Sequence, residues 1–316
     1  MKYIIGYDGG GSKTRCVLAN TQGEILSDLV AGPSNHQMIG IEKTKDVIED
    51  LYLKTLEKTN LKPEAIGVIY LGLAGADLPC DFEKLNTIGE EIFKNTTFQI
   101  VNDAWIILKS GLLDHWGAVS IYGTGANAAI ITPTGERKIL RALGYIAGGY
   151  GGGGDMAREA LHLAFRSNEK THGKTKLEVE LPKLFNASSM DHLLKLLYPE
   201  NKITKESYKR IPPLVFELAK RGDQVCIDLL KEMGRTQGKM LTGVLKSVSL
   251  EKEHLPIVIG GSIFNGVSNH FVDSMLLEIK KYAADAYLIK PKYPPVYGAI
   301  FSAYEYMGID IPKRFQ

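Results

Sequence analysis

The chain has 316 residues, and at roughly 150 residues per domain this length predicts about two domains. Hydrophobic residues make up 44% of the chain and charged residues 23%, which excludes a largely disordered protein. The 38 basic and 36 acidic residues leave a net charge of +2, which excludes a protein that binds nucleic acid mainly through its charge.

Short apolar runs and tight turns open the chain. They predict an antiparallel meander of three strands, at residues 3–7, 15–20 and 24–31. Apolar residues then recur at helical spacing over residues 40–59. The following segment alternates between strands and helices, expected at 66–73 (strand), 80–94 (helix), 98–101 (strand) and 104–113 (helix).

The pattern of strand, glycine turn and strand restarts near residue 117. This weak internal repeat predicts two halves of related architecture. Residues 155–250 are mostly helical in pattern, with breaks expected at Gly173, Pro199 and Pro212-Pro213. The other elements expected here are strands at 118–122, 128–131, 255–259 and 286–289, and a last helix over 297–307.

A glycine-rich hairpin follows the first strand, with the sequence Asp8-Gly9-Gly10-Gly11-Ser12-Lys13-Thr14. Consecutive glycines allow several backbone N–H groups to approach one anion, and Ser12, Lys13 and Thr14 add donors and a positive charge. Asp8 at the strand end can hold Mg²⁺ through water. The hairpin is not a Walker A loop, because Ser12 precedes Lys13 and a strand follows. An ordinary surface hairpin is the alternative.

Two further glycine turns follow buried strands. Gly123-Thr124-Gly125 begins a match to the Rossmann fingerprint, but a strand follows it where that motif needs a helix. A second phosphate-binding hairpin is the better interpretation, and a plain turn is the alternative. Gly260-Gly261-Ser262 would let a flat or anionic ligand approach the backbone closely, or it is a simple turn between a strand and a helix.

Asp103 ends a strand and opens a helix. A carboxylate in this position can act as a general base on a substrate hydroxyl group. It can also simply cap the helix, which is a common use of aspartate.

Taken in order, these motifs resemble the sugar kinase/actin/Hsp70 superfamily. Within it, they are most similar to the N-acetylglucosamine kinase-like group, also called the BadF/BadG/BcrA/BcrD ATPase family. Three further segments look like family motifs: Pro33-Ser34-Asn35-His36, Leu73-Ala74-Gly75-Ala76-Asp77 and Asn102-Asp103-Ala104. The resemblance extends from Tyr3 to about Gly308, nearly the whole chain.

The resemblance implies an α/β protein of two ribonuclease-H-like (actin-like ATPase) domains with an ATP cleft between them. The first domain would cover residues 1–114, joined by the C-terminal helix at about 297–316. The second would cover 115–296, with a helical insertion at about 155–250. That insertion also favours a homodimer.

The resemblance also implies the roles of single residues. Asp103 would be the catalytic base and Asp8 the Mg²⁺ site, with ATP and Mg²⁺ as cofactors. Phosphates would be bound by Gly10, Gly11, Ser12, Lys13, Thr14, Gly123, Thr124 and Gly125, and adenosine by Gly260, Gly261 and Ser262. The sugar-like substrate would contact Asn35, His36, Ala74, Gly75, Ala76, Gly149 and Tyr150.

One departure from the family pattern concerns the acceptor. The family usually has Gly-Asp-Glu-Gly-Ser-Gly where this chain has Gly148-Gly149-Tyr150-Gly151-Gly152-Gly153. The acids that would contact the sugar are therefore replaced by Gly149 and Tyr150, and a site that loses such a partner loses discrimination. Asp155 is the nearest acid that could substitute for them, and the run of glycines predicts a flexible or ligand-ordered loop.

Three functions compete on this basis. We expect an ATP-dependent kinase of a sugar or amino sugar that acts in the cytoplasm on a small molecule, with no membrane or nucleic-acid partner. The first alternative is an activator ATPase, whose iron–sulfur cluster needs two cysteines per chain. Here Cys16, Cys80 and Cys226 lie far apart and form no CxxC pair. The second alternative is a nucleotide-binding regulatory protein without kinase activity.

Overall fold

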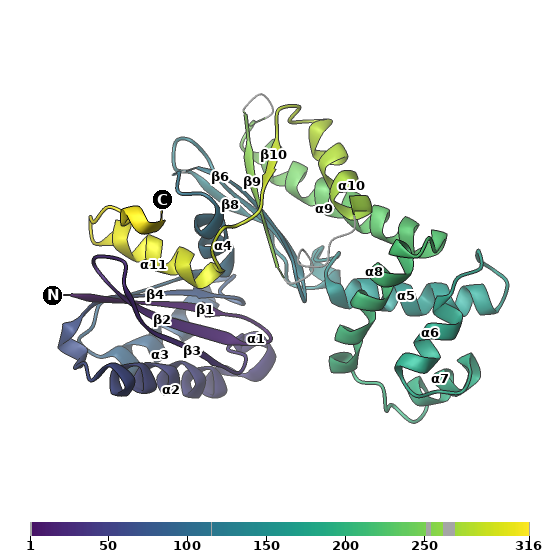
Figure 1. Cartoon of the computed structure of the whole chain (residues 1–316), viewed down its shortest axis with the longest axis horizontal. Coiled ribbons are helices and arrows are strands. Elements are labelled where there is room, and N and C mark those ends of the chain that lie inside the picture. Colours follow the sequence, from purple (N-terminus) through teal and green to yellow (C-terminus); the bar gives the residue numbers. More distant parts are fainter. Residues whose placement is uncertain (1, 115, 251–253, 262–268, 316) are drawn as a thin grey trace. The chain divides into compact units, whose positions relative to one another are not determined.

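The computed structural model describes residues 2–114, 116–250, 254–261 and 269–315 (Figure 1). The chain divides into two compact units. The first comprises Met1–Gly117 and Ile289–Gln316, and the second comprises Ala118–Leu288. The domain boundaries predicted from the sequence lie at residues 114–115 and 296–297. Each unit is described by itself.

The first unit is built on a mixed sheet of five strands in the order β3-β2-β1-β4-β5. The predicted meander is confirmed, because β1 pairs antiparallel with β2 and β2 with β3. Beyond β1 the pairing becomes parallel, from β1 to β4 and from β4 to β5. The bounds are β1 (Tyr3–Gly9), β2 (Thr14–Asn20), β3 (Ile25–Ala31), β4 (Ile66–Leu73) and β5 (Phe98–Asn102).

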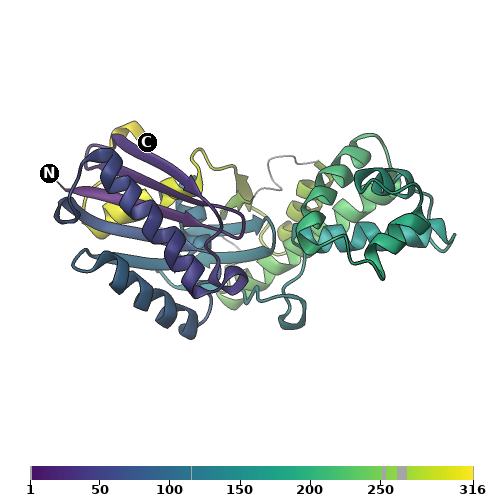
Figure 2. The same cartoon turned by 90° about the horizontal axis from the view of Figure 1, so that it is seen from below.

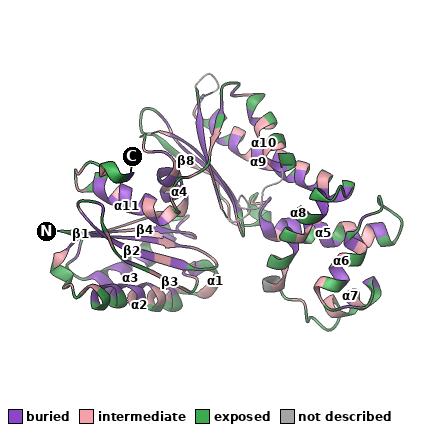
Figure 3. Cartoon of the chain, viewed as in Figure 1, coloured by how far each residue is buried: buried purple, intermediate pink, exposed green. Residues whose placement is uncertain are grey.

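Helices cover both faces of this sheet (Figure 1). Side chains alternate between the faces of a strand, so Ile5 and Tyr7 of β1 pack toward α2 and α3, whereas Ile4 packs toward Ile300 of α11. Helix α4 lies beside α11 on that second face. Figure 3 shows the buried inner sides of these helices. The bounds are α1 (His36–Ile39), α2 (Ile41–Thr59), η1 (Pro63–Ala65), α3 (Pro79–Phe93), α4 (Asp103–Gly111), α11 (Pro295–Tyr306) and η5 (Lys313–Phe315).

The second unit contains another sheet of five strands, in the order β10-β9-β6-β7-β8. Strand β6 pairs parallel with β9, and β7 pairs antiparallel with β8. Strand β8 was not predicted, because it is a short edge strand whose Arg137 and Lys138 are exposed and give no apolar alternation. The bounds are β6 (Gly117–Tyr122), β7 (Ala126–Ile131), β8 (Arg137–Ile139), β9 (Pro256–Gly260) and β10 (Tyr287–Ile289).

The predicted helical segment of the second unit is present, and Figure 2 shows its helices grouped together. Helix α8 begins at Ile211, so Pro212-Pro213 lies in its first turn and the predicted break coincides with the boundary between η3 and α8. Helix α10 was not predicted. The bounds are η2 (Tyr145–Ala147), α5 (Gly153–Asn168), α6 (Leu177–Leu184), α7 (Met190–Leu197), η3 (Lys205–Arg210), α8 (Ile211–Lys220), α9 (Gln224–Ser247) and α10 (Asn269–Lys280).

A buried glutamine fixes α9 to the sheet of the second unit. The Gln237 side chain is fully buried, and its Nε2 donates to Ser120 Oγ at 2.8 Å and to the Asn127 carbonyl oxygen at 3.0 Å. Because these partners lie on β6 and β7, one side chain connects both strands that flank the second glycine turn. Among the described helices, none combines the length and apolar character needed to cross a membrane.

Candidate active site

Three aspartates lie at one edge of the sheet of the first unit. The parallel strands β1, β4 and β5 end there, with Asp8 level with Gly72 and Leu73 level with Asn102. Adjacent strands are about 4.8 Å apart, so β1 and β5 are separated by roughly 10 Å across β4. That spacing leaves room for reacting groups between Asp8 and Asp103. Asp77 lies in the loop after β4, at the same edge.

Two glycines show that Asp8 projects from the face of the sheet that α4 covers. A Cβ on Gly6, two residues before Asp8, would meet Ile300 of α11 at 3.0 Å. A Cβ on Gly72, the pairing partner of Asp8, would meet Ile106 of α4 at 2.3 Å. Side chains two residues apart, and side chains of paired residues, share a face. Asp8 therefore lies on the side of the sheet where α4 begins with Asp103.

Burial and mutual repulsion make these carboxyl groups unusually weak acids. Burial, then the negative charges of Asp8 and Asp77, raise the pKa of Asp103 to about 7, although the N–H groups of Ala104 and of Asp103 itself lower it. Burial likewise raises the pKa of Asp8 to about 6, against the opposing effect of Lys13 and Arg15. A carboxylate whose pKa lies near neutrality is suited to accept a proton from a hydroxyl group.

The first glycine hairpin is held close to the neighbouring chain. Gly10 N–H donates to the Lys13 carbonyl oxygen at 3.0 Å and closes the turn between β1 and β2. A Cβ on Gly9 would meet Ser34 Oγ at 2.4 Å, so only glycine allows the loop that precedes Asn35 to approach. Ser12 and Lys13 are exposed and can face a ligand.

Thr14 requires a correction. It was expected among the phosphate-binding residues, but its side chain is fully buried. Its hydroxyl group bonds to the Gly32 carbonyl oxygen and to Ser34 Oγ, both at 2.8 Å. The Thr14 side chain thus fixes the loop before Asn35 and is not available to a phosphate group.

The structure brings two of the predicted substrate-binding segments together. Gly75 has a φ of +90°, and a Cβ there would meet Asn35 Oδ1 at 2.6 Å. Asn35 Oδ1 also accepts the Gln37 N–H at 3.0 Å and caps α1. Among the described residues, no acceptor bonds to Asn35 Nδ2, so this group can donate to a ligand. Ala74 N–H bonds to the Gly9 carbonyl oxygen at 2.8 Å, and the Ala76 side chain is buried.

His36 also requires a correction. It was expected to contact the substrate, but it is buried, and its Nε2 lies 2.9 Å from Asp81 Oδ1. Its bond with Asp81 links α1 to the first turn of α3. We therefore assign His36 to the framework of the loop that carries Asn35.

Four polar residues around the site were not predicted as part of it. They form one hydrogen-bonded network with the predicted segments and comprise Gln37, Asp77, Asp81 and Asn102. Asp77 and Asn102 lie within segments that resemble family motifs, but nothing in the sequence signals that they bond to each other. No sequence pattern indicates that Asp81 belongs to this network, because an aspartate in the first turn of a helix is common.

In the second unit, three glycine segments meet at one turn. Gly153 N–H donates to the Gly123 carbonyl oxygen at 2.8 Å, and a Cβ on Gly152 would meet Gly125 Cα at 2.5 Å. A Cβ on Gly261 would meet the Tyr122 carbonyl oxygen at 2.2 Å. The predicted second phosphate loop and the predicted adenosine segment, Gly260 and Gly261, are thus adjacent. Ser262, the third predicted adenosine contact, lies outside the described residues.

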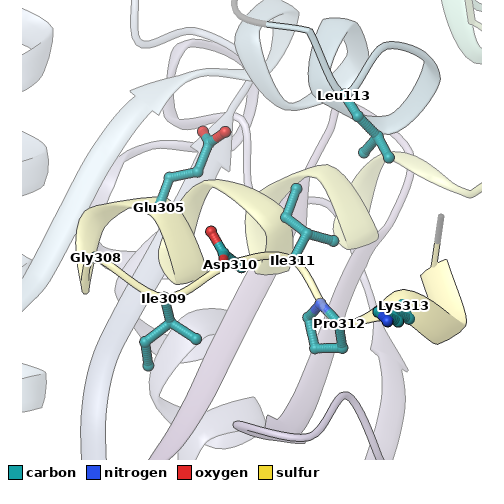
Figure 4. Close-up of a pocket in the computed structure, with 8 residues that line it drawn as sticks. All are labelled: Leu113, Glu305, Gly308, Ile309, Asp310, Ile311, Pro312 and Lys313. Carbon is teal, nitrogen blue, oxygen red and sulfur yellow. The ribbon is translucent and has the colours of Figure 1, made fainter.

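A cavity of about 810 Å³ lies elsewhere in the first unit (Figure 4). It is lined by Leu113, Glu305, Gly308, Ile309, Asp310, Ile311, Pro312 and Lys313. The carboxylate of Glu305 is paired with Lys109 at 2.5 Å. None of the predicted site residues lines this cavity, so it is separate from the carboxylates at the strand ends.

Residues 5–303 match the model of the BadF/BadG/BcrA/BcrD ATPase family. The chain belongs to this family. Three curated relatives are similar to it. An N-acetylmuramic acid/N-acetylglucosamine kinase of Clostridium acetobutylicum is 27% identical over 307 residues, which cover 96% of this chain and 98% of the relative. An N-acetyl-D-glucosamine kinase of Dictyostelium discoideum is 26% identical over 287 residues, covering 87% of this chain and 90% of the relative. A glucosamine kinase of Vibrio cholerae is 24% identical over 73% of this chain and 76% of the relative.

Solved structures share the fold. A protein of Chromobacterium violaceum, described as a candidate N-acetylglucosamine kinase, has a TM-score of 0.75 at 20% identity, over 95% of this chain and 98% of the other. A ROK family glucokinase of Streptomyces griseus has a TM-score of 0.63 at 17% identity, over 96% of this chain and 99% of the other. The predicted α/β fold of the sugar kinase and actin-like ATPase class is confirmed.

The loop that departs from the BadF/BadG pattern does not regain its acids through Asp155. Asp155 Oδ2 accepts the N–H groups of Gly151 and Gly152, at 2.9 and 3.1 Å, and Oδ1 pairs with Arg158. The acid that could have substituted therefore caps the start of α5. Gly152 packs on the turn at Gly125, so the C-terminal part of this glycine run is in contact with the second glycine turn.

Tyr150 also bonds within the second unit. Burial raises the pKa of its hydroxyl group, and so do the charge and the hydrogen bond of Glu159. Its ring makes an edge contact with Tyr145, with the centroids 6.0 Å apart, and Tyr145 itself is exposed. A Cβ on Gly149 would lie 2.8 Å from the Gly144 nitrogen, so the family aspartate does not fit this loop conformation.

Asp8 fits a magnesium ion for which water molecules and phosphate oxygens supply most of the ligands. Among the described residues, no group of three or more His, Cys, Asp and Glu side chains could enclose a metal ion. Mg²⁺ typically uses one or two carboxylates together with water and substrate phosphates. Asp8 is desolvated, and it accepts no hydrogen bond in the described part of the chain. Its negative charge also raises the pKa of Asp103. A cation beside Asp8 would therefore offset an unfavourable buried charge.

Proposed function

We propose that this chain is an ATP-dependent kinase that transfers the γ-phosphoryl group to a hydroxyl group of an amino sugar, with Asp103 as the general base. The observation that carries this proposal is the pair of carboxylates Asp8 and Asp103, on one face of the sheet at the ends of β1 and β5, on either side of β4. The three curated relatives support the kinase activity, since each is named as a kinase of an amino sugar.

The proposed chemistry assigns a separate task to each carboxylate. Asp103 would accept the proton of the acceptor hydroxyl group, for which a pKa of about 7 is well matched. Asp8 would hold Mg²⁺ through water, and the ion would supply charge neutralisation for the phosphate groups. Catalysis of phosphoryl transfer comes mainly from such positioning and from electrostatic stabilisation.

Phosphate oxygens would be bound by the glycine hairpins. In the first unit the available donors are backbone N–H groups at Gly10 and Gly11 and the side chains of Ser12 and Lys13. In the second unit they are the turn of Gly123, Thr124 and Gly125, with Gly260 and Gly261 beside it for adenosine.

The acceptor would lie against the loop segments that meet at Gly75. In the described part of the chain no acceptor bonds to Asn35 Nδ2, so this group can donate to a sugar oxygen. Gly75 allows Asn35 to lie against it, because a side chain at position 75 would collide with Asn35. Tyr150 would offer its ring in place of the family acid.

The cysteines argue against the activator alternative. Cys16 is buried on β2, Cys226 is buried on α9, and Cys80 is exposed at the start of α3. Burial raises the pKa of the Cys16 thiol to about 11, which disfavours the thiolate that a cluster needs.

The experiment is a coupled assay of ADP release with Mg²⁺-ATP, run over glucosamine, N-acetylglucosamine, N-acetylmuramic acid and glucose. Product sugar phosphate is identified by ³¹P NMR. We expect acceptor-dependent ADP release with at least one amino sugar. ATP hydrolysis that no acceptor accelerates would contradict the proposal.

A further inference from the structure

We propose that Asp77 is a positioning residue for Asp103, because one of its carboxylate oxygens bonds to Asn102, which caps α4, and the other bonds to Gln37 of α1, the helix capped by Asn35. This inference rests on the proposed function, in which Asp103 is the base and Asn35 contacts the acceptor.

The first connection runs through Asn102. Asp77 Oδ1 accepts a hydrogen bond from Asn102 Nδ2 at 2.8 Å, and the same nitrogen donates to the Ala76 carbonyl oxygen at 3.2 Å. These two bonds fix which way the amide group of Asn102 points. Its Oδ1 then accepts the Ala104 N–H at 2.9 Å and caps the helix whose first residue is Asp103. Asn102 is buried, so water cannot easily replace a lost partner.

The second connection runs through Gln37. Asp77 Oδ2 accepts from Gln37 Nε2 at 3.3 Å, and this nitrogen also lies 3.1 Å from the Gly75 carbonyl oxygen. The backbone N–H of Gln37 is in turn held by Asn35 Oδ1. One carboxylate therefore links the proposed base to the proposed acceptor contact.

Asp77 also acts on Asp103 through its charge. Within the first unit, the charges that raise the pKa of Asp103 are Asp8 from β1 and Asp77 from the loop after β4. Lys13 and Arg15 act on Asp8. Asp81 and His36 act on Asp77. Asp77 therefore holds the base in place, and its charge adds to the effects of burial and of Asp8 that raise the pKa of Asp103.

The test compares two substitutions at position 77. Asp77→Asn removes the negative charge and offers only one acceptor to two donors, so Asn102 or Gln37 loses its hydrogen bond to residue 77. We expect kcat to fall about tenfold to a hundredfold, the size typical of a small misplacement of a reacting group, while KM for ATP stays unchanged. In a plot of kcat against pH, the acidic limb should move to lower pH, because a negative charge that raised the pKa of Asp103 is gone. Asp77→Glu keeps the charge, so kcat should fall without a shift of the limb.

Asp81→Asn is the matched control. It removes an equal charge from the same network but loses no bond to Asn102, so the acidic limb should stay in place. An acidic limb that is unmoved in Asp77→Asn, or one that moves equally in Asp81→Asn, would overturn the proposal.

A second readout does not depend on turnover. The carboxyl carbon of Asp103, assigned by comparison with Asp103→Asn, is titrated by ¹³C NMR. We expect a lower midpoint in Asp77→Asn than in the wild type, and equal midpoints would overturn the role of Asp77. If no acceptor is phosphorylated but the midpoint shifts, the proposed function fails while the link between Asp77 and Asp103 stands.

Discussion

At the scale of single residues, the unusual feature is a carboxyl group that folding makes a weaker acid. The pKa of Asp103 in the folded chain is about 7, whereas an unfolded aspartate has a pKa of about 4. Between these values the folded chain holds a proton that the unfolded chain releases. Ionisation of Asp103 therefore destabilises the fold as pH rises through this interval.

Asp103→Asn should remove that penalty. The free energy of unfolding of the variant, relative to the wild type, should increase as pH rises from about 4 toward about 7 and then level off. Urea unfolding at pH 4, 5, 6, 7 and 8 measures the difference. A difference that is constant with pH would mean that Asp103 is not desolvated as described.

Asp8 is expected to act through the metal. Asp8→Ala should abolish most of the Mg²⁺-dependent part of ATP binding while ATP alone binds as in the wild type, because the adenosine segment is untouched. Calorimetric titration of ATP with and without Mg²⁺ measures both. Asp50→Ala is the control, since Asp50 is an exposed residue of α2 that pairs with Lys54 four positions on. An unchanged Mg²⁺ effect in Asp8→Ala would remove Asp8 from the metal site.

At the scale of elements, Gly72 sets how closely α4 approaches the sheet. A Cβ at this position would overlap the Ile106 side chain, so Gly72→Ala should lower the free energy of unfolding by about 1–3 kcal/mol. Ile106→Ala alone should cost about 2–5 kcal/mol through the cavity it leaves. The double variant should cost clearly less than the sum, because the new methyl group then occupies the space that Ile106 vacates. Additive costs in a urea-unfolding cycle would show that the two positions do not meet.

We expect the loop from Gly148 to α5 to affect how strongly an amino-sugar acceptor is bound. Loss of one hydrogen bond to a charged partner costs about 1.5–3 kcal/mol, which is roughly tenfold to a hundredfold in affinity. Because Asp155 caps α5 and Gly149 leaves no room for a side chain, we expect N-acetylglucosamine to be a weak acceptor. Steady-state kinetics over the amino sugars measures this. A sub-millimolar KM for N-acetylglucosamine with fast turnover would contradict it.

The strongest elements were predictable because their patterns are local. The continuous apolar run at 66–73 matches β4, and the meander follows from short turns between alternating strands. Strand β8 and helix α10 were not predicted. In those segments the local pattern is weak, and tertiary packing decides the outcome.

At the scale of the whole molecule, sequence order identified the motifs but not their contacts. The approach of Asn35 to Gly75 and the bond between Asp77 and Asn102 join segments far apart in the chain, so no local pattern reports them. The same limit explains Thr14 and His36, whose residue types suit a ligand but whose side chains point into the framework. The position of ATP relative to the two units, a homodimer and a cytoplasmic location stay predictions.

The central claim is that Asp103 acts as the base in phosphoryl transfer. The most direct measurement is kcat for Asp103→Asn and for the wild type, with Mg²⁺-ATP and the best amino-sugar acceptor at saturation. Asparagine keeps the shape of aspartate but cannot take the proton, so kcat should fall by about 10²–10⁴ while KM for ATP changes little. Turnover of the variant close to that of the wild type would contradict the account and leave Asp103 as no more than the first residue of α4.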